Sequence, residues 1–194
     1  MCMRFYLKKA EAPPELWALI DAMNRGRFQR SEVKTAGEIR PTDVTMALAC
    51  SQKMEIKPFA MRWGYDEGNK LLFNARSESA DRLPVFMDGF LHRRCLIPVT
   101  NYFEWEHRGS EKIKYAISQQ NRELTYLAGI YRIVWGRPEY TILTREPAEK
   151  IAFIHDRMPL MMDKEMVKDW LNPRYQGKEL LKYAVEDVAF VKIE

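Results

Sequence analysis

A cysteine at position 2 follows the initiator methionine directly, and this place gives it a chemistry that no internal cysteine has. Removal of Met1 would leave a free α-amine beside the thiol of Cys2. Such a 1,2-aminothiol condenses with an aldehyde to an imine, and the thiol then adds to the same carbon and closes a five-membered thiazolidine ring. An α-amine has an unperturbed pKa of about 8 and a cysteine thiol one of about 8.5, so both are partly reactive near neutral pH. An accident of the second codon is the alternative that position alone allows.

An amide and a guanidinium lie on one face of a predicted strand in the run Leu-Leu-Phe-Asn-Ala-Arg. Successive side chains of a strand point to opposite sides, so Asn74 and Arg76 share a face that Ala75 does not. Together they could hold a phosphate or a sugar oxygen, because arginine offers a rigid fork of donors. A surface strand with a solvated arginine would show the same pattern.

A carboxylate stands among aromatic residues where an apolar strand ends. Glu104 lies between Phe103 and Trp105, and such surroundings partly desolvate a carboxylate, raise its pKa and suit it to proton transfer. Glu106 lies on the same strand face and is an alternative for this role, and both could instead be solvated. Trp105 is either a core residue or a platform on which a nucleic-acid base stacks.

A third group able to move protons is His155, which ends an apolar run and precedes Asp156 and a proline-directed extended stretch. This pattern places His155 at the end of an element, where a histidine can shuttle protons near neutral pH. A lone histidine can equally be structural. The other histidines, His92 and His107, lie in charged, turn-like sequence, and we expect them to be solvated.

The three cysteines are an odd number, which argues against a disulfide framework and for a reducing compartment. Cys50 and Cys95 lie in apolar strand-like runs, where we expect buried structural thiols. These two cysteines and His92 lack the paired spacing of a zinc site. We therefore expect neither a metal nor a cofactor.

The composition is that of one globular domain. The chain has 194 residues, 46% hydrophobic and 30% charged, and no repeat or linker divides it, so we expect a single domain over residues 1–194. The sequence has neither a secretory signal nor an apolar run of membrane-spanning length, which predicts a soluble cytoplasmic protein without a membrane partner. We also expect a monomer. The net charge of +4 permits a nucleic-acid partner without requiring one.

Strand patterns dominate the elements that must position these groups. Runs rich in β-branched and aromatic residues predict strands at 44–50, 56–65, 70–75, 94–106, 112–118, 124–135, 139–144 and 188–194. Helical spacing predicts fewer helices, at 14–24, 78–90, 146–153 and 164–171, with Pro84 near a boundary or kink. The expected fold class is α+β, with a mostly antiparallel sheet curled toward a barrel and short peripheral helices.

Several sequence blocks, taken in order, resemble those of one known family. They are an initiator Met-Cys followed by Arg4, the Trp63-Gly64 pair, Phe-Asn-Ala-Arg-Ser-Glu at 73–78, Arg-Arg-Cys-Leu-Ile-Pro-Val through Phe-Glu-Trp at 93–105, Leu-Thr at 143–144 and His-Asp-Arg-Met-Pro at 155–159. The blocks span nearly the whole chain. They resemble the SOS response-associated peptidase family, whose members shield abasic sites and carry an N-terminal catalytic cysteine.

This resemblance implies that Cys2 forms a thiazolidine crosslink with the ring-opened aldehyde of an abasic site in single-stranded DNA. It also implies that Asn74, Glu104 and His155 share the active site with Cys2. The implied DNA contacts come from Arg4, Trp63, Arg76, Trp105, Thr144 and Arg157. Family members are further proposed to remove their own leading residue. The chain would then be a cysteine autopeptidase with a lyase-like crosslinking activity, cytoplasmic and associated with the nucleoid when it is bound to DNA.

The sequence departs from the family pattern in three places. Position 3 is usually glycine and is Met3 here, which adds bulk beside the nucleophile. The residues at 38–42 replace a loop in which the family has an asparagine, so that asparagine has no counterpart. The block at 144–148 also differs, which weakens the assignment of Thr144.

Two other classes of function remain compatible with the residues. An N-terminal-nucleophile amidohydrolase would use Cys2, Asn74 and His155 on an acyl substrate and would not depend on DNA. A non-catalytic nucleic-acid-binding module would use its tryptophans and arginines only to stack and to neutralise phosphates. Covalent capture of DNA would distinguish the function that the resemblance implies from both alternatives.

Overall fold

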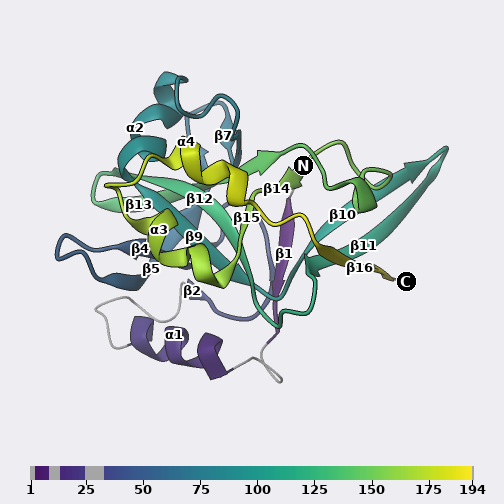
Figure 1. Ribbon diagram of the computed structural model, residues 1–194, viewed down its shortest axis with the longest axis horizontal. Helices are drawn as coiled ribbons and strands as arrows, with labels where there is room; N and C mark the ends of the chain where they lie inside the picture. The colour runs from purple at the N-terminus through teal and green to yellow at the C-terminus, as the bar shows by residue number, and fades with distance from the viewer. Residues whose placement is uncertain (1–2, 9–13, 25–32, 194) are drawn as a thin grey trace.

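The computed structural model describes residues 3–8, 14–24 and 33–193 of the chain. Its described part is mostly β, with short helices around a strongly curled sheet (Figure 1). The predicted α+β class with a barrel-like core is therefore confirmed. No helix in the described ranges is long and apolar enough to cross a membrane.

Five strands close into a small barrel. Their order is β13–β5–β4–β9–β12, and β12 pairs with β13 again to complete the circle. The bounds are β4 (Val44–Cys50), β5 (Ile56–Trp63), β9 (Arg94–Val99), β12 (Thr125–Val134) and β13 (Arg137–Arg145). Only the short contact between β13 and β5 is parallel, while the other pairs of this ring are antiparallel. The apolar strand runs seen in the sequence thus become the wall of the barrel.

Short strands extend this sheet at its margins. They are β2 (Val33–Lys34) beside β4, β8 (Asn74–Arg76) and β14 (Met158–Pro159) beside β13, and β15 (Met161–Met162) beside β12. A separate two-stranded hairpin consists of β6 (Tyr65–Asp66) and β7 (Leu71–Leu72), which flank the turn sequence after β5. Because β8 runs parallel to the end of β13, residues far apart in the sequence meet there.

A second, antiparallel sheet lies against the barrel. Its order is β16 (Val188–Ile193), β11 (Glu111–Gln119), β10 (Asn101–Arg108), β1 (Arg4–Leu7) and β3 (Gly37–Ile39). The β10–β11 hairpin extends away from the body on the right of Figure 1. The predicted strand 94–106 is in fact two strands, since the chain leaves the barrel at Thr100, whose backbone N–H and hydroxyl both donate to the carbonyl oxygen of Tyr6.

Helices cover the outside of this framework. They are α1 (Pro14–Asn24), which packs against β5, α2 (Pro84–His92), α3 (Val167–Leu171) and α4 (Gly177–Leu180), with 3-10 turns η2 (Glu149–Ile151), η3 (Lys164–Met166) and η4 (Leu181–Tyr183). The first predicted helix has the bounds that the sequence indicated. The predicted helix 78–90 begins only at Pro84, and 146–153 contains a single 3-10 turn. Pro147 accounts for the loss of the first position of the latter helix, because it disfavours helical backbone at Glu146.

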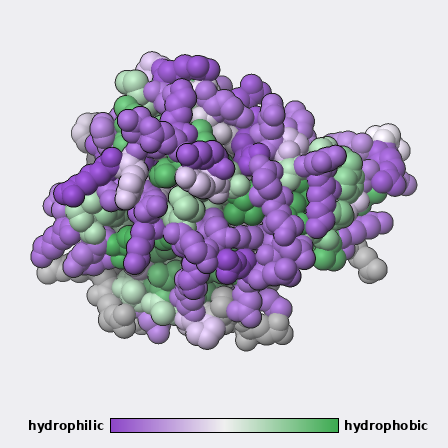
Figure 2. All heavy atoms as spheres, in the orientation of Figure 1, coloured by the Kyte–Doolittle hydropathy of each residue, from purple (hydrophilic) through white to green (hydrophobic). Residues whose placement is uncertain are grey.

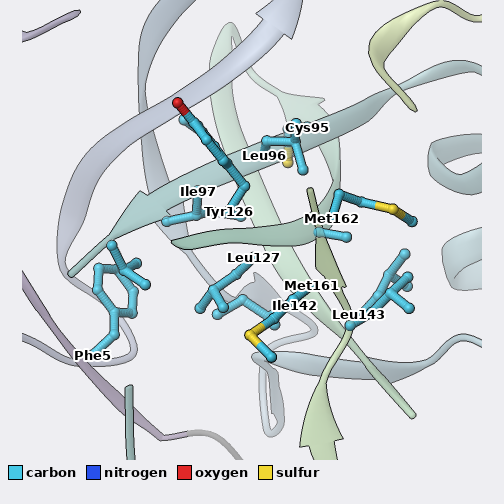
Figure 3. Close-up of a cluster of buried hydrophobic side chains, with 14 of the residues drawn as sticks. Phe5, Cys95, Leu96, Ile97, Tyr126, Leu127, Ile142, Leu143, Met161 and Met162 are labelled. Carbon is cyan, nitrogen blue, oxygen red and sulfur yellow. The ribbon is translucent and has the colours of Figure 1, made fainter. Parts of the chain in front are cut away.

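One apolar core joins the barrel to the second sheet (Figure 3). Phe5 from β1 lies against Trp63 from β5, with 5.1 Å between the ring centroids, and Trp63 stacks on Tyr140 from β13. All three side chains are fully buried. The strand that leads out of the N-terminal residues is therefore anchored in the core of the molecule.

A buried arginine fixes the C-terminal segment to this core. Arg94 in β9 is 3% exposed, and its guanidinium donates to the backbone carbonyl oxygens of Phe90, Leu91, Trp170, Asn172 and Tyr175. The C-terminal ends of α2 and α3 thereby share one cation, which suits the negative end of a helix. Burial lowers the pKa of Arg94 to about 10, so it remains charged at neutral pH.

Candidate active site

A pocket lies where β1 begins beside β10. Its volume is about 420 Å³, and the described residues that line it are Met3, Arg4, Glu104, Trp105, His107, Lys112 and His155. Arg4 pairs in register with Phe103 across the two strands, which brings Met3 to the level of the pocket. A carboxylate, two imidazoles and two cations therefore surround one opening.

Glu104 is the buried carboxylate of this pocket. Its side chain belongs to the inward face of β10 and the residue is only 4% exposed, although it lies one position from the partly exposed Trp105. Burial raises the pKa of Glu104, and the nearby charge of Asp156 raises it further. Glu104 therefore keeps its proton to a higher pH than an exposed carboxyl group, as an acid that exchanges protons with an amine requires.

Glu106, the alternative carboxylate, is engaged in the hairpin instead. The hydroxyl of Tyr115 donates to its Oε2 over 2.9 Å, and Arg108 donates from Nε to its Oε1 over 3.0 Å. Arg108 also forms an ion pair with the same carboxylate at 2.8 Å. These contacts lower the pKa of Glu106 against the opposing effect of desolvation, so it is a structural anion of β10 and β11.

His155 reaches the pocket from a different part of the chain. It lies in an irregular segment between η2 and β14, rather than at the end of an element as the sequence suggested. Its Nδ1 is 2.7 Å from Oδ1 of Asp156 and 3.0 Å from the backbone N–H of Arg157. Burial lowers the pKa of His155 and outweighs the opposing effect of Asp156, so the neutral imidazole is favoured near pH 7.

Arg157 ties the segment that carries His155 to the turn after β8 and to β13. The Arg157 guanidinium makes two hydrogen bonds with the Glu78 carboxylate, of 2.8 and 2.9 Å, and donates to the carbonyl oxygen of Thr144 over 2.7 Å. This bidentate pair lowers the pKa of Glu78. A phosphate contact by Arg157 would require its ion pair with Glu78 to open. In the present structure Arg157 instead holds in place the segment that carries His155.

Asn74 and Arg76 occupy β8, in parallel register with Ile142 and Thr144 of β13. Asn74 is half-buried and its Oδ1 is excluded from solvent, while Arg76 is exposed and Ala75 between them is buried. The alternation expected from the sequence is therefore present. Asn74 is not among the described residues that line the pocket, so its predicted catalytic role stays a prediction.

Cations and aromatic rings share the outer face of the second sheet next to the pocket. The Arg4 guanidinium lies 5.2 Å from the ring centroid of Trp105, and Lys114 Nζ lies 3.8 Å from that of Phe103. The Glu38 carboxylate on β3 forms ion pairs with Arg4 at 3.4 Å and with Lys114 at 3.5 Å. Such a surface suits a single strand of nucleic acid, whose bases stack and whose phosphates need counter-charge.

Two residues expected to contact DNA do not lie at the surface. Trp63 is fully buried, and its indole N–H donates to the carbonyl oxygen of Phe73 over 2.8 Å. Thr144 is 1% exposed beneath Arg157. The expectation that these side chains line a DNA groove does not agree with their positions, and both instead support the layer under the site.

Sequence reasoning missed two lysines at this face and did not place His107 in the pocket. Lys112 lines the pocket and Lys114 covers the aromatic rings, and both lie directly opposite β10 residues in the hairpin register. The alternation of lysine with apolar residues along residues 112–117 was the available signal. His107 is exposed, as predicted, yet it also lines the pocket.

Cys2, the predicted nucleophile, lies outside the described residues. What the structure describes is its covalent neighbour Met3, which is 51% exposed at the pocket. Among the described residues, no group of three or more His, Cys, Asp or Glu side chains is arranged to hold a metal ion. Cys95 is fully buried, as expected, and Cys50 is only partly so.

Solved structures share this fold. A protein from Bacteroides thetaiotaomicron covers the whole of this chain with a TM-score of 0.76 at 21% sequence identity. A protein from Bordetella bronchiseptica does so with a TM-score of 0.77 at 17% identity. At these identities the likeness concerns the fold alone. It places the barrel with its flanking sheet among known architectures.

The family itself is defined by sequence. Residues 1–193 match the family model described as SOS response associated peptidase, SRAP. The chain therefore belongs to the SRAP family. The resemblance noted in the sequence blocks is confirmed by this match over nearly the whole chain.

Curated relatives carry a common name. The abasic site processing protein YoaM of Bacillus subtilis is 36% identical over 140 residues, which are 65% of this chain and 61% of that protein. The protein of this name from Escherichia coli, YedK, is 28% identical over 63% of this chain and 58% of its own length. The abasic site processing protein HMCES of Gallus gallus is 29% identical over 67% of this chain and 50% of its own length. The matches thus span about half to three-fifths of these relatives.

Proposed function

We propose that this chain processes abasic sites in single-stranded DNA and shields them by covalent capture through Cys2 once Met1 is removed. Its relatives are named for abasic-site processing, and it belongs to their family. The observation that supports the proposal most is the pocket itself, in which Met3, Glu104 and His155 meet. The chain neighbour of the nucleophile thus lies beside a protonatable carboxyl group and a neutral imidazole.

The proposed reaction begins with the closed hemiacetal ring of the abasic deoxyribose. His155, as a neutral base, takes the proton from the C1′ hydroxyl, the bond from C1′ to the ring oxygen breaks, and His155 returns the proton to that oxygen, which gives the open-chain aldehyde. The α-amine of Cys2 adds to the aldehyde carbon, and the carbinolamine loses one water to give an imine. Glu104 supplies the proton that the departing hydroxyl needs. The Cys2 sulfur then bonds to the imine carbon while its proton passes to the nitrogen, so the thiazolidine forms with the net loss of one water.

The ring-closed product explains why a thiol is needed beside the amine. An imine at the abasic carbon acidifies the neighbouring C–H and invites β-elimination of the phosphate, which cuts the strand. Closure to the thiazolidine removes the imine and with it this path. The proposed protein is therefore a shield of the lesion, and its autopeptidase step is the removal of Met1 that frees the amine.

The DNA contacts proposed for this reaction do not depend on base identity. Arg4 and Lys114 lie over aromatic rings beside the pocket, and Arg76 is exposed on β8. Cations that meet phosphates and rings that stack on bases bind single strands with little sequence preference. A lesion sensor needs this property, because an abasic site has no base to read.

The test compares three oligonucleotides that differ at one position: an abasic site, its tetrahydrofuran analogue without an aldehyde, and an intact nucleotide. We expect a heat-stable protein–DNA species with the abasic site alone. Equal amounts with the tetrahydrofuran analogue would contradict aldehyde capture. Hydrolysis of a small amide without any DNA adduct would instead favour the amidohydrolase alternative.

A further inference from the structure

A second and larger pocket opens at the other end of the barrel. Its volume is about 570 Å³, and it lies between the β4–β5 turn and the β12–β13 turn. β13 begins at this mouth with Arg137 and ends at Arg145, which pairs with Met158 near His155. At about 3.3 Å per residue, the strand separates the two pockets by roughly 25 Å. The barrel-mouth pocket is therefore distinct from the candidate active site.

The barrel is open here because two of its strands separate. β5 and β13 pair only through Arg62 with Glu139 and Trp63 with Tyr140. The earlier half of β5 has no such pairing with β13 and leaves apolar side chains facing the gap. They form the floor of the pocket, together with residues from β12 and β13: Phe59, Met61, Tyr131, Ile133 and Pro138.

Apolar surface continues from this pocket onto its rim. Ile133 is 60% exposed although it lines the pocket. Met54 and Ile56, which are also exposed at the β4–β5 turn, line a separate pocket with Lys168 and Leu171 and do not belong to this rim. Figure 2 shows hydrophobic atoms among hydrophilic ones on the left of the molecule, the side on which Figure 1 labels β4, β5 and β13. Exposed apolar side chains at the edge of an apolar pocket are found at interaction sites more often than chance.

Trp135 stands at the tip of the β12–β13 turn, next to Gly136 of the pocket rim. It is 97% exposed, and its backbone has a φ of +51°. The left-handed region is unfavourable for a bulky residue, and asparagine followed by glycine is the favoured pair in such a turn. A tryptophan that is both strained and fully exposed has no folding role in the described structure. Tryptophan is among the residues most enriched in binding hot spots, so the exposed Trp135 is suited to contact a partner.

The charge around the mouth is positive. Lys53 and Lys57 line the pocket and Arg137 follows the tip. Lys57 forms an ion pair with Glu55 at 2.5 Å, whereas no ion pair recorded within the described ranges involves Lys53 or Arg137. The rim therefore presents a net excess of cations around an apolar floor, and it complements a partner with the opposite arrangement.

We propose that the barrel mouth is a docking site for a short acidic segment of a partner protein, which inserts a bulky apolar side chain between the two turns. The apolar floor takes the inserted side chain, Trp135 and Ile133 cover it, and the cations meet flanking aspartates or glutamates. A small ligand would use the pocket alone and would leave Trp135 without a function. The proposal is independent of the abasic-site chemistry, which takes place at the other end of β13.

The test is a selection of short peptides from a displayed random library on the immobilised wild-type protein. We expect enriched peptides in which a Trp, Phe or Leu is flanked by two or more acidic residues. Their affinity, measured with synthetic peptides by fluorescence anisotropy, should fall about ten-fold or more in Ile133→Glu and about five-fold or more in Trp135→Asn. Met87→Glu is the matched control, because Met87 is 42% exposed on α2 and does not line the mouth.

Several results would overturn the proposal. They are the absence of enrichment over the Ile133→Glu protein, the enrichment of basic peptides, and an equal loss of affinity in Met87→Glu. A loss of affinity for single-stranded DNA in Ile133→Glu would assign the mouth to nucleic acid instead. Thermal melting of each variant shows that it is folded, and Trp135→Asn should melt higher than the wild type while binding peptide less tightly.

Discussion

Burial moves the two groups that we propose to transfer protons in the pocket toward their neutral forms. The pKa of Glu104 is raised and that of His155 is lowered, in each case chiefly because water is excluded. Groups in a cleft whose pKa values are shifted by burial and by a nearby charge are typical of sites where protons move. At neutral pH, His155 is the group ready to accept a proton, and Glu104 holds one longer than an exposed carboxyl group would.

Replacement of Glu104 by glutamine should lower the crosslinking rate and raise the stability of the fold. Amide substitution keeps the shape but removes the proton, so we expect crosslinking with the abasic oligonucleotide to slow by about a hundred-fold or more. Because the folded pKa of Glu104 lies above its unfolded value, its contribution to stability is complete at low pH and is lost as pH rises through the folded pKa. The advantage of Glu104→Gln in melting temperature should therefore grow from about pH 4 to pH 8.

Glu106→Gln is the control for this experiment. It should retain crosslinking, because Glu106 is held by Arg108 and Tyr115 in the hairpin. Its folded pKa is lowered, so its stabilising effect is present at neutral pH and is lost on acidification. Slower crosslinking in Glu106→Gln than in Glu104→Gln would reverse the assignment of the two carboxylates.

Replacement of Asp156 by asparagine should shift the pH dependence of the reaction. Asp156 favours the protonated imidazole of His155 from 2.7 Å, against the larger effect of burial. Without this charge the pKa of His155 falls further, so the rise of the crosslinking rate with pH should begin at a lower pH. An unchanged profile in Asp156→Asn, beside the exposed control Asp21→Asn, would show that His155 does not titrate in the reaction.

At the level of elements, the β12–β13 turn joins two well-paired strands but has at its tip a residue that is unfavourable for its backbone conformation. Trp135→Asn should stabilise the protein by about 1 kcal/mol, because asparagine tolerates the left-handed backbone that tryptophan adopts there. For a chain of this size, that is a rise in melting temperature of roughly 2–4 °C. Differential scanning calorimetry measures it. A loss of stability would mean that Trp135 makes a folded-state contact that its exposure does not indicate.

Arg94 is the opposite case, a residue whose role lies entirely in the fold. Arg94→Met should destabilise the protein by about 3 kcal/mol or more, because five backbone carbonyl oxygens lose a charged donor inside the molecule. Urea denaturation measures this difference. Arg93→Met is the control, since the Arg93 side chain is partly exposed and its one ion pair among the described residues is with Asp88, so its loss should be under about 1 kcal/mol.

Most elements could be predicted because their signals are local. The bounds of β4 and α1 follow from residue type and periodicity alone. The break at Thr100 could not be predicted, because it depends on the carbonyl of Tyr6 from a distant strand. The choice between Glu104 and Glu106 was also beyond the pattern, since both lie on one strand face and only the hairpin register brings Tyr115 to Glu106.

The sequence indicated which residues could belong to the site, but not which residues they contact. Trp63 and Trp105 look alike in the sequence, yet long-range packing buries the first against Tyr140 and leaves the second beside Arg4. The pairing of Arg157 with Glu78 joins residues that are 79 positions apart, and no local sequence pattern predicts it. The resemblance supplied the role of each residue, whereas the structure supplied its surroundings.

At the level of the whole molecule, one small barrel carries two separate surfaces. The second sheet brings the N-terminal strand and the cationic aromatic face to one end of β13, where His155 lies. The other end opens between two turns into the larger apolar pocket. We therefore expect Ile133→Glu to leave capture of abasic DNA unchanged, and changes at the pocket of Glu104 to leave the barrel mouth intact.

The most direct test of the account is the intact mass of the protein after it is mixed with a single-stranded oligonucleotide that carries one abasic site. The account predicts a heat-stable species whose mass equals the protein without Met1 plus the DNA minus one water, and no such species from Cys2→Ser. A heat-stable adduct from Cys2→Ser, or no adduct from wild-type chains that have already lost Met1, would contradict it.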